Sequence, residues 1–235
     1  IFAIVPKIAV LVLFARIFQN SLFSTVYWWQ SIILFCAMCS VLIGSFVALK
    51  QRKMKRLIAY SAISHVGYLL IAFGLGTFIG LQSLFFYIFI YMITGICVWS
   101  IVMSLESQSN TKISTSRNLS DLSLLIKSNP ILAITFAIAL FSLAGVPPLA
   151  GFYAKMQIFL ASVESCMFFI ATIGILSSVI STFYYIRIIK TLYFDKVLVW
   201  NFYQPINQGK SLVLGLSFFL IVLLFLSPNL FSLWA

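Results

Sequence analysis

Charged side chains are scarce in this sequence of 235 residues, since only 8% of them are charged while 63% are hydrophobic and 17% are aromatic. A water-soluble domain of this size cannot cover its surface with so few polar groups. The scarcity excludes a soluble globular protein and predicts an integral membrane protein.

Acidic residues are the rarest charged type, with four Asp and Glu residues in total, and histidine occurs once. Each acid falls in a predicted loop or at a predicted helix end: Glu106, Asp121, Glu164 and Asp195. No carboxylate of this chain is therefore expected to neutralise a cation inside the membrane, and no residue set indicates a metal site. The sequence also lacks a G-x-G-x-x-G nucleotide turn and a cysteine set for iron–sulfur ligation, so we expect no redox cofactor in this chain.

The four cysteines, Cys36, Cys39, Cys97 and Cys166, lie within or at the edge of apolar runs, where cysteine acts as a small packing residue. Cys36 and Cys39 form a C-x-x-C pair, which in principle suits redox chemistry or half of a metal site. Because no second pair and no nearby base accompany them, we favour packing.

Continuous apolar runs of about 20 residues each predict seven membrane-spanning helices. A lone strand would leave its backbone groups unpaired in lipid, which argues against β-structure. We therefore predict an all-α, polytopic membrane helix bundle that forms one membrane domain over residues 1–235. The predicted spans cover residues 1–19, 28–49, 57–75, 78–104, 130–163, 166–192 and 211–232.

The basic residues give the chain a formal net charge of +11 and predict its orientation. If every run crosses once, 11 of the 15 Lys and Arg residues fall on one side of the membrane, while Arg16 alone falls on the other. By the positive-inside tendency the basic side faces the cytoplasm or, in a mitochondrion, the matrix. These charges flank membrane spans, so we do not expect nucleic-acid binding.

The connection 105–128 is the longest, and it is polar. It ends in "NLSDLSLLIKSNP", whose leucines recur at helical spacing. We predict a loop on the basic side that ends in a short amphipathic helix at the membrane interface.

The run 130–163 is too long for one straight span, because the segment from Ile131 to Ser162 would extend nearly 50 Å against a hydrocarbon core of about 30 Å. Proline lacks an N–H group and clashes with the preceding turn, so carbonyls near 141–143 are expected to lose their partners. Such bare backbone is tolerated only against protein or a water-filled cavity. We predict a discontinuous helix, broken at Gly145, Pro147, Pro148 and Gly151.

Lys7, His65 and Lys155 lie well inside predicted spans. Lys7 precedes Phe18 by 11 residues and His65 follows Arg56 by nine, which places both about 13–16 Å from a span end, beyond the reach of a snorkelling side chain. Lys155 follows Gly151 by one turn. A buried ammonium without a carboxylate loses its proton readily, because burial disfavours the charged form. The two lysines, with His65 between them, predict a proton relay.

Structural interpretations remain for each feature. Carbonyls freed by a packing kink could satisfy Lys155, and His65 could bond one helix to another. Further polar residues could line a hydrated path or bond helix to helix: Tyr60, Ser61, Ser64, Tyr68, Thr94, Tyr153 and Gln157. For Arg187 we favour snorkelling to the basic interface.

Three stretches together resemble one known family: "MKRLIAYSAISHVGYLLIAFG", "NPILAITFAIALFSLAGVPPLAGFYAKMQIF" and "SSVISTFYYIRIIKTLYF". They are similar to the chain 2 family of mitochondrial NADH:ubiquinone oxidoreductase (respiratory complex I), whose bacterial counterpart is chain N and whose wider relatives are cation/proton antiporter subunits. The resemblance runs from "PKIAVLVLFARIF" to the last apolar run.

The resemblance implies a fold of about 14 helices with two inverted five-helix repeats, of which this chain looks like the eighth to fourteenth helices. Lys7 then matches a central lysine on the eighth helix, and Lys155 matches the lysine of the second broken helix, in the outward-facing half-channel. His65 matches a position on the tenth helix. The family's glutamate on the fifth helix and lysine on the seventh would lie upstream of Ile1.

The resemblance therefore implies a proton-translocating membrane-arm subunit of complex I, in the mitochondrial inner membrane with its basic loops in the matrix. NAD, FMN, iron–sulfur clusters and ubiquinone are expected elsewhere in the complex. Expected partners are other membrane-arm subunits, phospholipids, and a chain or segment that carries the missing N-terminal half. A fragmented gene or a truncation would both produce such a half. A stand-alone cation/proton antiporter and a structural assembly subunit are the alternatives.

Overall fold

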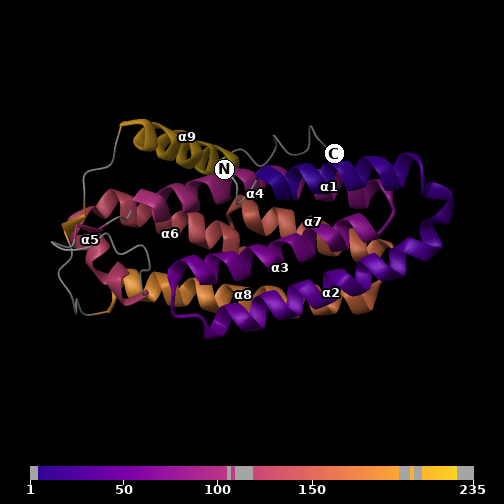
Figure 1. Ribbon diagram of the computed structural model, residues 1–235, viewed down its shortest axis with the longest axis horizontal. Coiled ribbons are helices and arrows are strands. Elements are labelled where there is room, and N and C mark those ends of the chain that lie inside the picture. Colours follow the sequence, from indigo (N-terminus) through magenta and orange to yellow (C-terminus); the bar gives the residue numbers. More distant parts are fainter. Residues whose placement is uncertain (1–4, 105–106, 109–118, 196–201, 204–207, 227–235) are drawn as a thin grey trace.

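A computed structural model describes residues 5–104, 107–108, 119–195, 202–203 and 208–226. The long helices run side by side along one axis, and successive connections alternate between its two ends (Figure 1). The all-α class is confirmed. The long helices are α1 (Val5–Asn20), α2 (Val26–Lys50), α3 (Met54–Gly74), α4 (Phe78–Ser104), α6 (Pro130–Ala144), α7 (Ala150–Glu164), α8 (Phe168–Tyr193) and α9 (Gln208–Leu226).

Four of the described helices, α2, α3, α4 and α8, are long and apolar enough to cross a membrane by length and composition. Helices α6 and α9 are apolar but shorter. Each predicted run contains a helix, although the number of seven spans stays a prediction.

The predicted discontinuous helix is present as α6 and α7, which occupy successive halves of the bundle's long axis (Figure 1). Helix α6 begins with Pro130 in its first turn, where a missing N–H costs nothing. It ends at Gly145, which has a left-handed backbone with φ 81°. Residues 145–149 then separate the two helices near the middle of the bundle.

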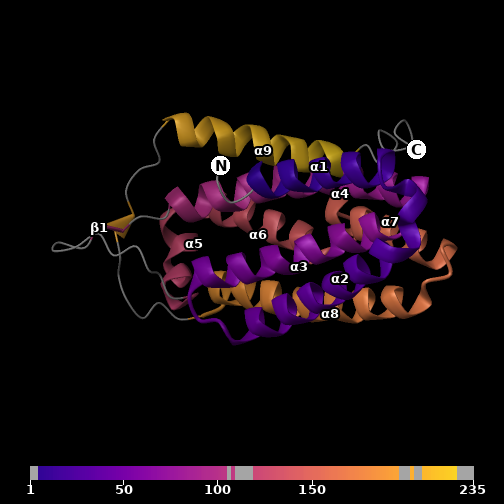
Figure 2. The same cartoon turned by 45° about the vertical axis from the view of Figure 1, so that its right-hand side comes forward.

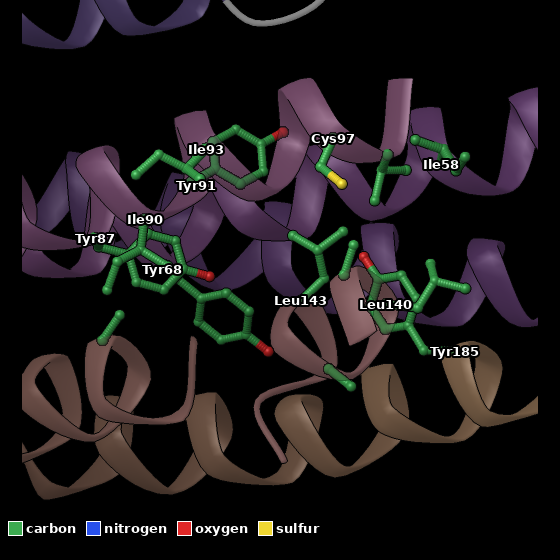
Figure 3. Packing of buried hydrophobic residues seen from close by; sticks show 14 of the residues in the cluster. Ile58, Tyr68, Tyr87, Ile90, Tyr91, Ile93, Cys97, Leu140, Leu143 and Tyr185 are labelled. Atoms are coloured by element: carbon green, nitrogen blue, oxygen red, sulfur yellow. The ribbon is translucent and has the colours of Figure 1, made fainter. Parts of the chain in front are cut away.

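The interior of the bundle contains aromatic side chains that carry hydroxyl groups. Tyr68, Tyr87, Tyr91 and Tyr185 lie among aliphatic residues, with Cys97 nearby (Figure 3). Large apolar side chains cover the outside, as on α8, where Val179 and Phe183 are both more than 60% exposed. An apolar exterior around a partly polar interior suits a protein whose surroundings are lipid or other membrane subunits.

The four cysteines are all free. Cys97 is buried in the core, as the packing interpretation predicts, whereas Cys36 and Cys166 are exposed and Cys39 is partly buried. The C-x-x-C pair therefore lies on the outward-facing side of α2.

The end of the bundle that carries the predicted basic connections also holds four of the short elements. A 3₁₀ helix, η2 (Leu119–Leu124), leads into α5 (Leu125–Ser128), and η2 packs against α8. Strands β1 (Ser107–Gln108) and β2 (Phe202–Tyr203) pair antiparallel and join two connections at this end (Figure 2). Another 3₁₀ helix, η1 (Phe23–Thr25), joins α1 to α2. The middle of the predicted loop, residues 109–118, lies outside the described residues.

Candidate functional site

The end of α6 forms a compact turn that satisfies the carbonyls of Phe141 and Ser142. The Gly145 N–H donates to the carbonyls of Phe141 and Ser142, each at 3.1 Å, and the Val146 N–H also donates to Phe141 at 3.1 Å. The prediction that the carbonyls near Phe141 lose their partners is therefore wrong for Phe141 and Ser142, because the left-handed Gly145 turns the chain back onto them. Leu143 and Ala144 differ, since the residues four positions on are Pro147 and Pro148, which have no N–H to donate.

Lys155 supplies the donor that Ala144 lacks. Its ammonium Nζ donates to the Ala144 carbonyl at 2.8 Å and lies 3.4 Å from Ser181 Oγ. The same Nζ lies 5.4 Å from the centre of the Tyr68 ring, within cation–π range. Lys155 is only 5% exposed. All of these partners are uncharged, so the lysine binds a freed carbonyl without a counter-ion.

The two glycines of the break allow Lys155 to reach this carbonyl. A Cβ at Gly151 would overlap the Ser142 carbonyl oxygen, so only glycine lets α7 begin directly against the end of α6. A Cβ at Gly145 would lie 3.0 Å from Lys155 Cδ. The break and the lysine are therefore one packed unit, in which the prolines remove a donor and the glycines make room for its replacement.

His65 lies at the junction of three helices. Its Nδ1 is 2.7 Å from the Tyr87 hydroxyl on α4, and its Nε2 is 3.0 Å from the Tyr185 hydroxyl on α8. The ring is 3% exposed and lies 5.1 Å, between centroids, from the ring of Tyr91. The helix-to-helix bond that we considered for His65 is present. This structural role is compatible with proton transfer by His65, because the Tyr87 and Tyr185 hydroxyls can also give and accept a proton.

A cavity of about 10 Å³ lies between His65 and Lys155. This volume is close to the minimum for one water molecule. Ser142 lines the cavity, and its buried Oγ has no hydrogen-bond partner among the described residues. The cavity therefore joins the break in α6 and α7 to the histidine on α3. Its walls are formed by His65, Tyr87, Ile90, Tyr91, Thr94, Ser142, Leu143, Gly151 and Lys155.

Lys7 lies apart from this cavity. It is half-buried on α1, which begins near the middle of the long axis and runs toward the end away from α5 (Figure 1). The structure thus brings His65 and Lys155 to one cavity and leaves Lys7 outside it, on a helix with an exposed outer face.

The other predicted polar residues were expected either to line a hydrated path or to bond helix to helix, and they differ in where they lie. Thr94 lines the cavity, and Tyr68 packs its ring against Lys155 while its hydroxyl bonds Ser177 Oγ at 3.0 Å. Ser61 and Ser64 donate to carbonyls of their own helix. Tyr153 is exposed, and Tyr60 and Gln157 are partly buried. The cavity lining does not include Tyr60, Ser61, Ser64, Tyr153 or Gln157.

Arg187, which we expected to extend to the basic membrane interface, also forms a hydrogen bond to another helix. Its Nη1 donates to the Leu49 carbonyl at 3.2 Å, in the last turn of α2. A cation at a helix C-terminus is favourable. Arg187 therefore connects α8 to α2 while it stays exposed.

The residues predicted for the site did not include Tyr87, Tyr91, Ser181 and Tyr185. A usable signal was present, because polar residues that recur every three or four positions in an apolar helix share one inward face. Tyr87, Tyr91 and Thr94 follow this spacing on α4, and Ser177, Ser181 and Tyr185 follow it on α8. Among the described residues, no group of three or more His, Cys, Asp or Glu side chains could hold a metal ion.

The fold and the site define a class of protein. A polytopic helix bundle whose broken helix holds an ionisable side chain at mid-depth is typical of ion-translocating membrane proteins. The chain belongs to the NADH:quinone oxidoreductase/Mrp antiporter membrane family, whose model matches residues 1–181.

Proteins with similar sequences belong to one branch of this family, the chain 2 and subunit N proteins. The chain is 45% identical over 228 residues to the NADH-ubiquinone oxidoreductase chain 2 of Marchantia polymorpha. The aligned region covers 97% of this chain and 45% of that protein. It is 37% identical to the NADH-quinone oxidoreductase subunit N of Paramagnetospirillum magneticum, over 97% of this chain and 46% of the relative. The resemblance to the chain 2 family is confirmed, and the chain spans about half the length of these relatives.

Solved structures agree with the fold. Respiratory complex I from Thermus thermophilus contains a chain that matches with a TM-score of 0.73 and 27% identity, over 85% of this chain and 44% of that one. The Mrp complex of Dietzia matches with a TM-score of 0.72 at 22% identity, over 87% of this chain and 36% of that one, which supports the fold alone.

Proposed function

We propose that this chain is a proton-translocating membrane-arm subunit of NADH:ubiquinone oxidoreductase, in the mitochondrial inner membrane. One observation carries the proposal: the Lys155 ammonium is buried at a helix break among uncharged partners and shares a cavity with His65. The names of the chain 2 and subunit N relatives supply the enzyme in which such a site would work.

The partners of Lys155 suit a group that must both hold and release a proton. The Ala144 carbonyl, Ser181 Oγ and the Tyr68 ring stabilise the ammonium by dipole and π interactions. A buried carboxylate would hold the charge permanently, whereas these neutral groups leave the uncharged amine accessible. A proton released by Lys155 would enter the cavity, whose polar lining also includes His65, Tyr87, Tyr91, Thr94 and Ser142.

Lys7 would exchange protons with this site from the side of α1. The outer face of α1 is apolar and exposed, with Val10 at 52% and Leu13 at 54%. Such a face fits a further segment or chain that carries the rest of a longer subunit, and other membrane-arm subunits and phospholipids would cover the remaining exterior. The basic connections would then lie in the matrix.

The redox chemistry would take place in other subunits, which would hold NAD, FMN, iron–sulfur clusters and ubiquinone. This chain would respond to it through shifts of charge and helix position along the membrane arm. Its contribution to the enzyme would be proton transport alone.

The test replaces Lys155 with alanine in the assembled complex, reconstituted into proteoliposomes. We expect the protons moved per NADH oxidised to fall, with the subunit still assembled, while Lys190→Ala, an exposed cation at the basic end of α8, leaves the ratio unchanged. Unchanged pumping in Lys155→Ala would support a structural subunit instead. Sodium-dependent flux through the isolated protein would support the stand-alone antiporter.

A further inference from the structure

We infer that Tyr87 relays protons between the cavity and His65, and that Tyr185 is a positioning residue that fixes which ring nitrogen of His65 accepts them. The inference rests on the proposed function and deepens it. It concerns two tyrosines that lie 22 and 120 positions from His65 in the sequence.

The two hydrogen bonds of His65 differ in length in a way that assigns their donors. Hydroxyl donors make bonds of about 2.7–2.8 Å, and N–H donors make bonds of about 2.9–3.0 Å. The Tyr87 hydroxyl lies 2.7 Å from Nδ1, and the Tyr185 hydroxyl lies 3.0 Å from Nε2. These lengths fit the tautomer in which Tyr87 donates to Nδ1 and Nε2–H donates to the Tyr185 oxygen.

A neutral imidazole can donate from only one nitrogen, so the two hydrogen bonds have a single donor-to-acceptor order. It runs from the Tyr87 O–H to Nδ1, and from Nε2–H to the Tyr185 oxygen. Tyr87 lines the cavity together with Lys155, whereas Tyr185 is fully buried on α8, away from the cavity wall. The Nδ1 lone pair of His65 is therefore reached from the cavity through the Tyr87 hydroxyl.

Proton transfer along these hydrogen bonds balances at each atom. A proton arriving from the Lys155 side bonds to the Tyr87 oxygen, and the original Tyr87 hydroxyl proton passes to Nδ1. His65 is then an imidazolium whose positive charge is shared by both nitrogens, with Nε2–H still bonded to Tyr185. In the reverse step the Nδ1 proton passes to the Tyr87 oxygen while Tyr87 releases its own hydroxyl proton to the cavity, which restores the starting state. Tyr185 keeps the ring in place while Tyr87 carries the proton in and out.

Tyr184 provides a matched control beside Tyr185. Both side chains are fully buried on α8, and their rings lie 4.6 Å apart between centroids. The Tyr184 hydroxyl has no hydrogen-bond partner in the described part of the chain, whereas that of Tyr185 bonds His65. Phenylalanine at either position removes one oxygen and keeps the ring, so a difference between the two variants reports the bond to His65.

The experiment measures protons moved per NADH oxidised by the intact complex in proteoliposomes, with the amount of assembled subunit measured in parallel. Tyr87→Phe is expected to lower the ratio to the value found for His65→Gln, since the hydroxyl that passes protons to His65 is lost. Tyr185→Phe is expected to give a smaller loss, and Tyr184→Phe none. In a His65→Gln background, which cannot shuttle protons, neither Tyr87→Phe nor Tyr185→Phe should lower the ratio further.

The inference is overturned if Tyr87→Phe behaves as Tyr184→Phe does, or if the tyrosine variants still lower the ratio in the His65→Gln background, as a packing role would. Retained pumping in His65→Gln alone overturns it as well, whatever the assembly of the tyrosine variants. Retained pumping in Lys155→Ala is a separate result, because it removes the proposed function itself.

Discussion

Lys155 takes the place, at the Ala144 carbonyl, of the backbone N–H that an unbroken helix would provide from residue 148. The distance from Nζ to the carbonyl oxygen is 2.8 Å, and Thr182 Oγ1 approaches the same oxygen at 3.3 Å. Side chains are among the groups that satisfy the last carbonyls of a helix. The charge of Lys155 is therefore coupled directly to the geometry of the break between α6 and α7.

Gly151→Ala should prevent the packing of α7 against α6. The added Cβ would overlap the Ser142 carbonyl oxygen, which belongs to a rigid helix end. We expect a loss of about 3 kcal/mol in stability, at the upper end for overpacking, measured by thermal unfolding of the assembled complex. Gly215→Ala in α9 is the control, because its Cβ meets nothing within 4 Å, and its stability should stay the same or rise slightly.

Gly145→Ala should weaken the site in two separable ways. The left-handed backbone, with φ 81°, costs a non-glycine residue about 1–2 kcal/mol. The new Cβ would also press on Lys155 Cδ, 3.0 Å away. Gly145→Asn shares the crowding but tolerates the backbone conformation better. We expect both variants to pump poorly and Ala to be the less stable; equal stability of the two would contradict the strain at this position.

An ordered water should bind Ser142 Oγ. This hydroxyl is 1% exposed, has no hydrogen-bond partner among the described residues, and lines a cavity of about 10 Å³. Buried polar groups of this kind are usually satisfied by internal water. A high-resolution map of the intact complex should show density about 3 Å from Oγ, and Ser142→Ala should remove it. An unoccupied cavity in such a map would contradict this expectation.

Arg187→Met should loosen the junction of α8 with α2. The lost bond to the Leu49 carbonyl and the lost charge at the C-terminus of α2 together are worth about 0.3–1 kcal/mol at an exposed site. Thermal unfolding of the complex measures this loss. Lys55→Met removes a cation at the same end of the bundle, from the first turn of α3, and should not destabilise. Equal losses in the two variants would mean that only total charge matters.

Local chemistry made the fold class and the helix break predictable from the residues alone. Hydropathy determines which segments avoid water, and Pro147, Pro148 and Gly145 interrupt a helix wherever it lies, because a missing N–H and a left-handed turn act within a few residues. The same reasoning predicted that His65 is buried, since it lies far from the nearest polar connection, and that Lys155 is buried, since it follows the break by one turn.

The partners of these residues depended on how the helices pack. Tyr87 and Tyr185 reach His65 from two other helices, and the choice of Ala144 as the acceptor for Lys155 follows from where Gly145 directs the chain. Lys7 looked equivalent to Lys155 by depth, yet it lies half-buried on α1 outside the shared cavity. Rotation and crossing of helices set these contacts, and many distant contacts act together to determine them, so no single stretch of sequence encodes the site.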